Sequence, residues 1–218
     1  MILLTGIRMK ILIGTPINVC KNYAMERWLE NVSKLQREYP ADSKSNSVDF
    51  LMVDNSPGFD YIKRVKGYCT KYGITNYRIE HLEINQQQPV EEIIGRSIEI
   101  IRQEVLDKDY DARFSWECDQ LIPANALSEL IKMMESGNFT IASHSTWVRV
   151  DPSQVLDELF GTTLIKREVL EKISFIPEMP DTWEPTDKWF RKQVLKDGGS
   201  TIEADGVLKP VYHLEDNL

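Results

Sequence analysis

The chain has 218 residues, of which 42% are hydrophobic and 28% charged, so it can bury one core but is too short for two full domains and a long linker. This composition excludes wholesale disorder, a collagen-like repeat and a disulfide scaffold. Because 34 acidic residues outnumber 26 basic ones, the net charge of −8 disfavours a broad electrostatic contact with nucleic acid or anionic lipid.

The cysteine pattern and the N-terminal residues favour a cytoplasmic protein. The three cysteines, Cys20, Cys69 and Cys118, are widely spaced and form no C-x-x-C pair, so they predict neither a disulfide framework nor a zinc site. Such thiols fit a reducing cytoplasm. The apolar runs near the N-terminus are too short to span a bilayer, so we expect no targeting or transmembrane segment. Residues 1–8 are interpreted as an extension that precedes the fold.

The first half of the chain alternates apolar runs with amphipathic segments. Short apolar runs predict buried parallel strands at 10–15, 48–53 and 77–82. Apolar residues at helical spacing predict helices at 25–35, 60–72 and 90–106. This alternation is typical of an α/β fold, in which ligands bind at the carboxyl ends of the strands.

The second half of the chain has a less regular pattern. We expect strands at 112–117, 139–143, 162–165, 200–204 and 207–213. Helices are expected at 125–135, 166–172 and 186–195, the last with Thr186 as its N-cap and Gly198-Gly199 after its end. A parallel half followed by such a half predicts a mixed sheet.

Two carboxylates follow the strand predicted at 112–117. Side chains alternate in an extended chain, so Glu117 and Asp119 are expected on one side, with Cys118 buried on the other. Trp116 is expected to face the core. Neighbouring carboxylates repel each other, and a hard divalent cation such as Mg²⁺ or Mn²⁺ relieves that repulsion. A solvated acidic turn is the alternative interpretation of this spacing.

The surroundings of this acidic motif resemble a known family. An apolar strand leads into Glu117-Cys118-Asp119, and Pro123 with an amphipathic helix follows. This segment resembles the D-x-D region of nucleotide-sugar-dependent glycosyltransferases of the GT-A fold, of the family 2 type. Further segments between residues 10 and 214 resemble the family in the same order. They are Ile13-Gly14-Thr15-Pro16, Val53-Asp54-Asn55-Ser56, Ile94-Gly95-Arg96-Ser97, the strand and helix from Gly161 to Leu170, Pro185-Thr186-Asp187-Lys188-Trp189-Phe190 and Val211-Tyr212-His213-Leu214.

The resemblance implies a fold and a reaction. The fold is a three-layer α/β/α sandwich with a central mixed, mainly parallel sheet. One domain spans residues 1–218, with a nucleotide-sugar half at about 10–123 and an acceptor half at about 124–218. The implied reaction is an inverting transfer of a sugar from a nucleoside diphosphate sugar to an acceptor hydroxyl, assisted by Mn²⁺ or Mg²⁺. The sugar, the base, the acceptor and the oligomeric state stay open.

The resemblance also implies a role for individual residues. Asp119 would hold the metal with His213 as a further ligand and Glu117 assisting, and Asp187 would be the general base. Contacts to the nucleotide sugar are implied for Thr15, Pro16, Asp54, Asn55, Arg96, Glu117 and Cys118. Acceptor-side contacts are expected for Gly161, Thr162 and Trp183, the last because sugar rings stack on aromatic faces.

Three positions depart from the family's pattern. Glu117 stands in place of the first Asp of D-x-D, Asn55 replaces an Asp after the second strand, and Thr186 stands where Glu is common. The metal is therefore expected to rest mainly on Asp119, and the role of base on Asp187 alone.

Several of these residues have plainer interpretations. Asp187 is also explained by a favourable interaction with the positive end of a helix. His213 is also explained as a structural histidine whose imidazole is hydrogen-bonded to the backbone. Arg96 is interpreted as a partner of phosphate or of Asp54, or as a solvated side chain. No function is assigned to His81.

Other classes of protein remain alternatives. A nucleotidyltransferase usually has a loop rich in glycine and basic residues after the first strand, and residues 14–21 contain one glycine. A dinucleotide-dependent dehydrogenase is disfavoured because no G-x-G-x-x-G follows that strand. A non-catalytic binding or interaction protein would leave the acidic motif as surface charge.

Overall fold

The computed structural model describes residues 9–39, 46–144, 161–177, 183–203 and 206–215. Its strands are β1 (Lys10–Ile17), β2 (Ser47–Asp54), β3 (Tyr77–His81), β4 (Ala112–Trp116), β5 (Gln120–Leu121), β6 (Ile141–Ser143), β7 (Thr162–Lys166), β8 (Thr201–Glu203) and β9 (Tyr212–His213). Its helices are the 3-10 turn η1 (Val19–Lys21), α1 (Asn22–Arg37), α2 (Asp60–Lys71), α3 (Val90–Asp107), α4 (Ala126–Ser136), α5 (Arg167–Lys172) and α6 (Thr186–Lys196). The extension expected at 1–8 lies outside the described residues.

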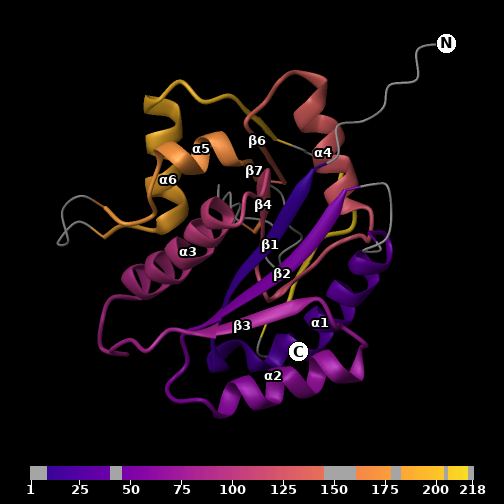
Figure 1. Cartoon of the computed structure of the whole chain (residues 1–218), viewed down its shortest axis with the longest axis vertical. Helices are drawn as coiled ribbons and strands as arrows, with labels where there is room; N and C mark the ends of the chain where they lie inside the picture. Colours follow the sequence, from indigo (N-terminus) through magenta and orange to yellow (C-terminus); the bar gives the residue numbers. More distant parts are fainter. Residues whose placement is uncertain (1–8, 40–45, 145–160, 178–182, 204–205, 216–218) are drawn as a thin grey trace.

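A seven-stranded sheet of order β3-β2-β1-β4-β7-β6-β8 forms the centre of the fold (Figure 1). Strands β3, β2, β1 and β4 are mutually parallel, β7 is antiparallel to both β4 and β6, and β8 is parallel to β6. The predicted mixed, mainly parallel sheet is therefore confirmed. The carboxyl ends of β1, β2, β3 and β4 lie at the same edge, where the sequence predicts the ligand site.

Helices cover both faces of this sheet. One hydrophobic cluster joins the sheet to α1, α2 and α4, and a second joins its other face to α3, α5 and α6. Figure 1 shows α3, α5 and α6 together on one side. Along β1, Ile11 and Ile13 belong to the first cluster and Leu12 to the second, as alternation in a strand requires. A Cβ on Gly14 would lie 2.1 Å from Ile101 Cγ2, so α3 packs directly on β1.

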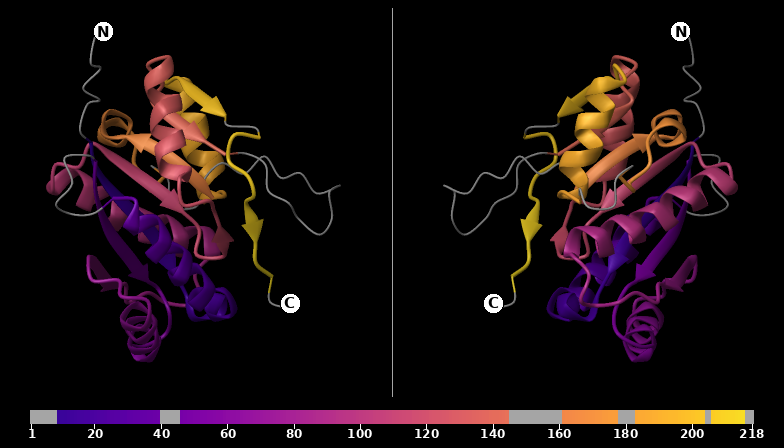
Figure 2. Two further views of the ribbon diagram at one scale, coloured as in Figure 1. Left: turned by 90° about the vertical axis from the view of Figure 1, so that its right-hand side faces the viewer. Right: turned by 90° about the vertical axis from the view of Figure 1, so that its left-hand side faces the viewer.

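The chain turns sharply where β4 ends. Trp116 is the last residue of β4, and a turn closed by the hydrogen bond from Gln120 N to Glu117 O (3.1 Å) replaces the extended run that we expected through the acidic motif. Strand β5 then pairs with β9 in a separate two-stranded sheet, in register Gln120 to His213. Figure 2 shows β9 running past the end of the main sheet.

Two expectations for the second half are wrong. The strand expected at 207–213 is limited to Tyr212–His213, since only these residues find a partner strand. Thr186 is the first residue of α6 rather than its N-cap, a position that Pro185 takes. The Thr186 hydroxyl instead donates to the carbonyl of Glu91 in α3 at 3.5 Å. Within the described part of the chain, no helix has the length and apolar character needed to cross a bilayer.

Candidate functional site

The turn after β4 brings the acidic motif next to the far end of the chain. The register of β5 and β9 places His213 opposite Gln120, and the backbone N–H of Leu214 donates to the carbonyl of Asp119 at 2.7 Å. His213 Nε2 lies 3.4 Å from Asp119 Oδ2 as a result. Two short strands therefore position a histidine beside a carboxylate that follows a central strand.

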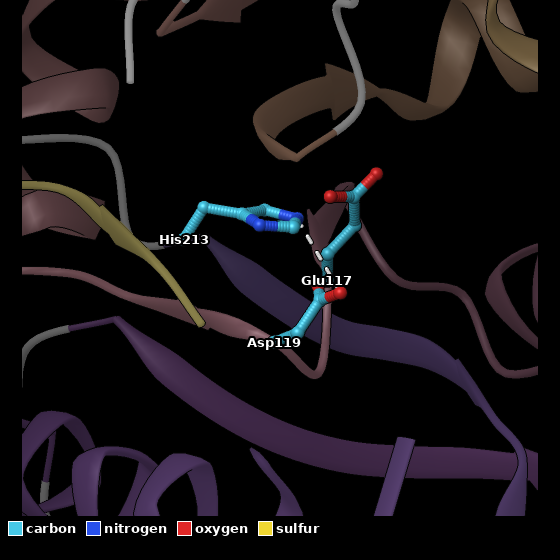
Figure 3. A group of neighbouring side chains, drawn as sticks. All are labelled: Glu117, Asp119 and His213. Carbon is cyan, nitrogen blue, oxygen red and sulfur yellow. Dashed lines mark ion pairs between the residues drawn. The ribbon is translucent and has the colours of Figure 1, made fainter. Parts of the chain in front are cut away.

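Glu117, Asp119 and His213 form one cluster of potential metal ligands (Figure 3). One ligand atom from each lies within 4.8 Å of the others, Asp119 is buried, and the other two residues are partly exposed. Two ligands of one Mg²⁺ ion lie at most about 4.2 Å apart, twice the usual bond length, so small side-chain rotations would bring this set into range. The carboxylate oxygens suit Mn²⁺ or Mg²⁺, and the imidazole nitrogen is a donor typical of transition-metal ions.

Lys21 supplies a positive charge to this cluster. Its Nζ lies 2.5 Å from Asp119 Oδ2, and the Tyr23 hydroxyl lies 3.4 Å from the same oxygen. Burial alone lowers the pKa of Lys21, but the charge of Asp119 and the hydrogen bond to its carboxylate outweigh burial and raise the pKa above its ordinary value. Lys21 is therefore an ammonium ion throughout the physiological range.

We expected no role for Lys21 from the sequence. Its contact with Asp119 depends on the neighbouring ends of β1 and β4, which are parallel partners in register Gly14 to Ser115. The sequence did offer one signal for this contact, which is a basic residue shortly after the first strand. The carboxyl ends of adjacent parallel strands lie together, so such a residue can reach the acidic motif that follows β4.

Asp54 is fully buried at the end of β2. Its Oδ2 lies 2.9 Å from His81 Nδ1, and its Oδ1 accepts a hydrogen bond from Ser56 N at 3.2 Å. The pairing of β2 with β3 places His81 directly beside Asp54, and the Phe59 ring lies 4.3 Å from the imidazole between ring centres. His81, to which we assigned no function, is thus the partner of Asp54.

Arg96 does not pair with Asp54, so that interpretation is wrong. Its guanidinium binds Glu92 at 2.7 Å, one helical turn earlier in α3, and the side chain is 45% exposed. This i,i+4 ion pair keeps the Arg96 side chain along α3, so the guanidinium does not reach Asp54 at the end of β2. A contact between Arg96 and phosphate stays a prediction.

Internal hydrogen bonds fix the loops around this edge of the sheet. The Thr15 hydroxyl donates to Trp116 O at 2.8 Å and links β1 to β4. The Asn55 amide accepts from Asn18 Nδ2 at 2.7 Å and donates to Ser97 Oγ at 2.9 Å. Pro16, next to Thr15, is partly exposed within β1. Thr15 and Asn55 therefore hold the loops at this edge of the sheet through hydrogen bonds within the protein.

The start of β7 packs against the acidic turn. Gly161 O accepts from Glu117 N at 3.0 Å, and a Cβ on Gly161 would lie 2.1 Å from Gln120 Nε2. The Thr162 hydroxyl donates to Gln120 Oε1 at 3.0 Å. Only glycine fits at position 161 without moving Gln120, so the strand approaches the motif closely.

Trp183 and Asp187 are not part of this cluster. A Cβ on Gly95 of α3 would lie 2.5 Å from Trp183 Cζ3, so the indole packs on the helix at its glycine. Asp187 is in the first turn of α6 and is partly exposed. Among the described residues, its carboxylate makes no hydrogen bond or ion pair. The structure does not join Asp187 to Glu117 or Asp119.

Two predictions about the acidic motif's neighbours are confirmed. Trp116 is 1% exposed and packs edge-on against Trp28, with ring centres 5.5 Å apart. Cys118 is buried, and burial raises the pKa of its thiol well above its ordinary value, with the charge of Asp119 adding to the effect. Cys118 is therefore a neutral thiol and not a nucleophile.

No family model and no curated protein sequence matches this chain. Solved structures do match it. A mannosyltransferase, PcManGT from Pyrobaculum calidifontis in complex with GDP-Man and Mn²⁺, matches with a TM-score of 0.68 and 14% identity over 91% of this chain and 55% of its own. S. aureus TarS 1–349 in complex with UDP-GlcNAc matches with a TM-score of 0.68 and 14% identity over 96% of this chain and 60% of its own.

These likenesses establish the fold. The chain has a GT-A-like glycosyltransferase fold, as the resemblance in its sequence implied. It spans about 55% to 60% of the length of these two solved structures. The three-layer arrangement and the mixed sheet agree with that assignment.

Proposed function

We propose that this protein is a metal-dependent, inverting glycosyltransferase that moves a sugar from a nucleoside diphosphate sugar to an acceptor hydroxyl. The observation that carries the proposal is the cluster of Glu117, Asp119 and His213 at the end of β4 in a GT-A-like fold. The three free cysteines support the cytoplasmic location that the sequence predicts.

The donor is proposed to bind across the carboxyl ends of β1, β2 and β4. Residues 15–16 and the buried Asp54 and Asn55 form the nucleoside end, held in place by the bonds described above. The exposed guanidinium of Arg96 is a candidate contact for phosphate. Cys118 is proposed to contact the donor through its backbone, because its thiol is buried.

The diphosphate is proposed to lie against the cluster of carboxylates and imidazole. Asp119 is the central ligand because it is buried, its position is fixed by Leu214, and His213 faces its Oδ2. Glu117 has a longer and more exposed side chain and assists. A divalent cation held there offsets the negative charge that grows on the leaving diphosphate.

The acceptor is proposed to enter between β7 and the start of α6. Asp187 takes the proton of the acceptor hydroxyl as its oxygen bonds to the anomeric carbon and the bond to the diphosphate breaks. A partly exposed carboxylate without a described partner is available for this role. Gly161 and Thr162 border the acidic turn, and Trp183 offers an aromatic face for the acceptor.

A binding panel tests the proposal. Thermal unfolding is followed with UDP- and GDP-linked sugars, with and without Mn²⁺, for the wild type, Asp119→Ala and the matched control Asp197→Ala, whose carboxylate pairs with Lys172 at the surface. We expect at least one donor to raise Tm only with Mn²⁺, in the wild type and the control but not in Asp119→Ala. A response that needs no metal and persists in Asp119→Ala contradicts the proposed site.

A further inference from the structure

Lys21 contacts the Asp119 oxygen that faces His213. Its Nζ lies 2.5 Å from Asp119 Oδ2, the same oxygen that His213 Nε2 approaches to 3.4 Å. Asp119 is almost fully buried, with 4% of its side chain exposed, so few other directions of approach to its carboxylate remain. A divalent cation shared by Asp119 and His213 therefore competes with the ammonium group of Lys21, because two positive charges on one oxygen repel each other.

The backbone of Lys21 is fixed, whereas its side chain is held only at its end, by the contacts of the ammonium with Asp119 Oδ2 and with the Tyr23 hydroxyl at 3.3 Å. Asn18 caps η1 by accepting from Cys20 N at 3.0 Å, and Val19 N donates to Ser56 Oγ at 2.8 Å, so hydrogen bonds hold this turn in place. The Lys21 side chain is 41% exposed and ends a flexible stem of four carbons. Displacement from Asp119 thus requires rotation of the side chain only.

A displaced Lys21 would face an anionic ligand at the same cluster. With its ammonium in place, the two carboxylates leave the cluster with a net negative charge. A divalent cation that replaces the ammonium neutralises the two carboxylates, so the displaced ammonium beside it makes the local charge positive. An ammonium beside a bound divalent cation is stabilised only by a group that carries several negative charges. Among the parts of a nucleotide sugar, the diphosphate is that group.

We propose that Lys21 couples cation binding to donor binding: it holds Asp119 in the cation-free protein and turns to the diphosphate of the donor when a divalent cation replaces it. This inference rests on the proposed function. Lys21 would thus weaken the binding of the metal alone. It would strengthen the binding of the donor once the metal is in place.

Calorimetry of two separate binding steps tests this coupling. Mn²⁺ is titrated alone, and then UDP and GDP are each titrated in saturating Mn²⁺, for the wild type, Lys21→Met and Lys172→Met. The last variant is a matched control, because Lys172 is an exposed lysine paired with Asp197 at 3.0 Å. In Lys21→Met we expect Mn²⁺ alone to bind more tightly and the nucleoside diphosphate more weakly, each by about tenfold, the size of one charge-assisted hydrogen bond. The control is expected to match the wild type in both steps.

The opposite signs of the two changes distinguish coupling from a structural role. A structural lysine would weaken both steps when removed, and either that result or no change in both overturns the inference while the metal and donor sites stand. A wild type that binds neither Mn²⁺ nor either nucleotide instead overturns the proposed function. Lys21→Gln, which keeps a polar side chain, repeats the test if Lys21→Met lowers Tm.

Discussion

His213 lies 3.4 Å from Asp119 because the two-residue strands β5 and β9 pair in a single register. The same pairing lets Leu214 N bind the carbonyl of Asp119 at 2.7 Å. The last described segment of the chain therefore completes the cluster that begins at the end of β4. Metal binding should depend on a residue that is distant in sequence but adjacent in the sheet.

Replacing His213 tests this relationship. His213→Ala removes the nitrogen ligand while the backbone pairing of β9 remains, so we expect Mn²⁺ affinity to fall by about tenfold or more, the range known for losses around metal sites. Calorimetry measures the change. Tyr212→Ala is the matched control, because Tyr212 is the other residue of β9 and is 51% exposed. Equal affinities in His213→Ala and the wild type would contradict the ligand assignment.

The buried pair of Asp54 and His81 makes a prediction about stability. His81→Ala leaves one oxygen of a fully buried carboxylate without its partner, so we expect the free energy of unfolding to fall by about 1–3 kcal/mol. Urea unfolding measures it. Phe59→Ala removes the ring that packs at a tilt against His81 but leaves the bond to Asp54, and Phe59 is 63% exposed, so its effect should be smaller. The reverse order of the two effects would contradict the pairing.

Replacing the buried Arg113 is expected to stabilise the protein, unlike the replacement of His81. It is fully buried in β4, its Nε and Nη1 have no hydrogen-bond partner among the described residues, and burial lowers its pKa to about 9. Its Nη2 makes only long contacts, at 3.3 Å to Ser115 Oγ and 3.5 Å to Gly14 O. Arg113→Met removes these unmet donors, and we expect the free energy of unfolding to rise by about 1–3 kcal/mol.

The pH dependence of this effect has a definite sign. A base whose pKa is lower in the folded state binds fewer protons there than in the unfolded chain, so its contribution to stability rises with pH above about 9. The advantage of Arg113→Met over the wild type should therefore shrink between pH 8 and pH 10 in urea unfolding. An advantage that grows with pH, or a variant less stable than the wild type at pH 8, would contradict the account.

Thiol reactivity tests the environment of the acidic motif. Cys20 is exposed, whereas burial raises the pKa of Cys69 to about 11 and that of Cys118 further above its ordinary value. Iodoacetamide at pH 8 should therefore label Cys20 alone in the folded protein, and all three cysteines in urea, as read by mass spectrometry. Rapid labelling of Cys118 in the folded protein would place it in the open site.

Asp187 is tested by separating binding from turnover. Asp187→Asn should lower kcat by about 10²- to 10⁴-fold, the usual contribution of a general base, while the affinity for the donor stays unchanged. Asp197→Asn is the control for a carboxylate at the other end of the same helix. The anomeric configuration of the product, read by proton NMR, should be opposite to that of the donor. A retained configuration would remove Asp187 from the mechanism.

Much of the fold could be predicted because its elements have strong periodic patterns. The strands from Lys10 to Trp116 and the helices between them were expected from apolar runs and helical spacing, and their alternation predicted the parallel half of the sheet. The acidic motif was found from its place at a strand end. Strand β5 was not predicted and β9 was predicted five residues too long at its start, because two residues are too few to show a period.

The missed site residues share one physical cause. Lys21 and His81 gain their partners from strands that lie side by side, and lateral strand order is not visible in local spacing. The partner of Arg96, in contrast, could have been predicted from local spacing. Glu92 stands four residues earlier in the same helix, and this spacing indicates their ion pair. Pro185 likewise explains why Thr186 enters the helix instead of capping it.

Release of nucleoside diphosphate from a panel of donor sugars, with Mn²⁺ and then with chelator, tests the central claim most directly. For at least one donor we expect Mn²⁺-dependent release, as slow hydrolysis without an acceptor, that is abolished by chelator and by Asp119→Asn but kept in Asp197→Asn. The contradicting result is no release from any donor. Equal release by Asp119→Asn, or pyrophosphate formed instead from a nucleoside triphosphate and a sugar phosphate, contradicts the claim as well.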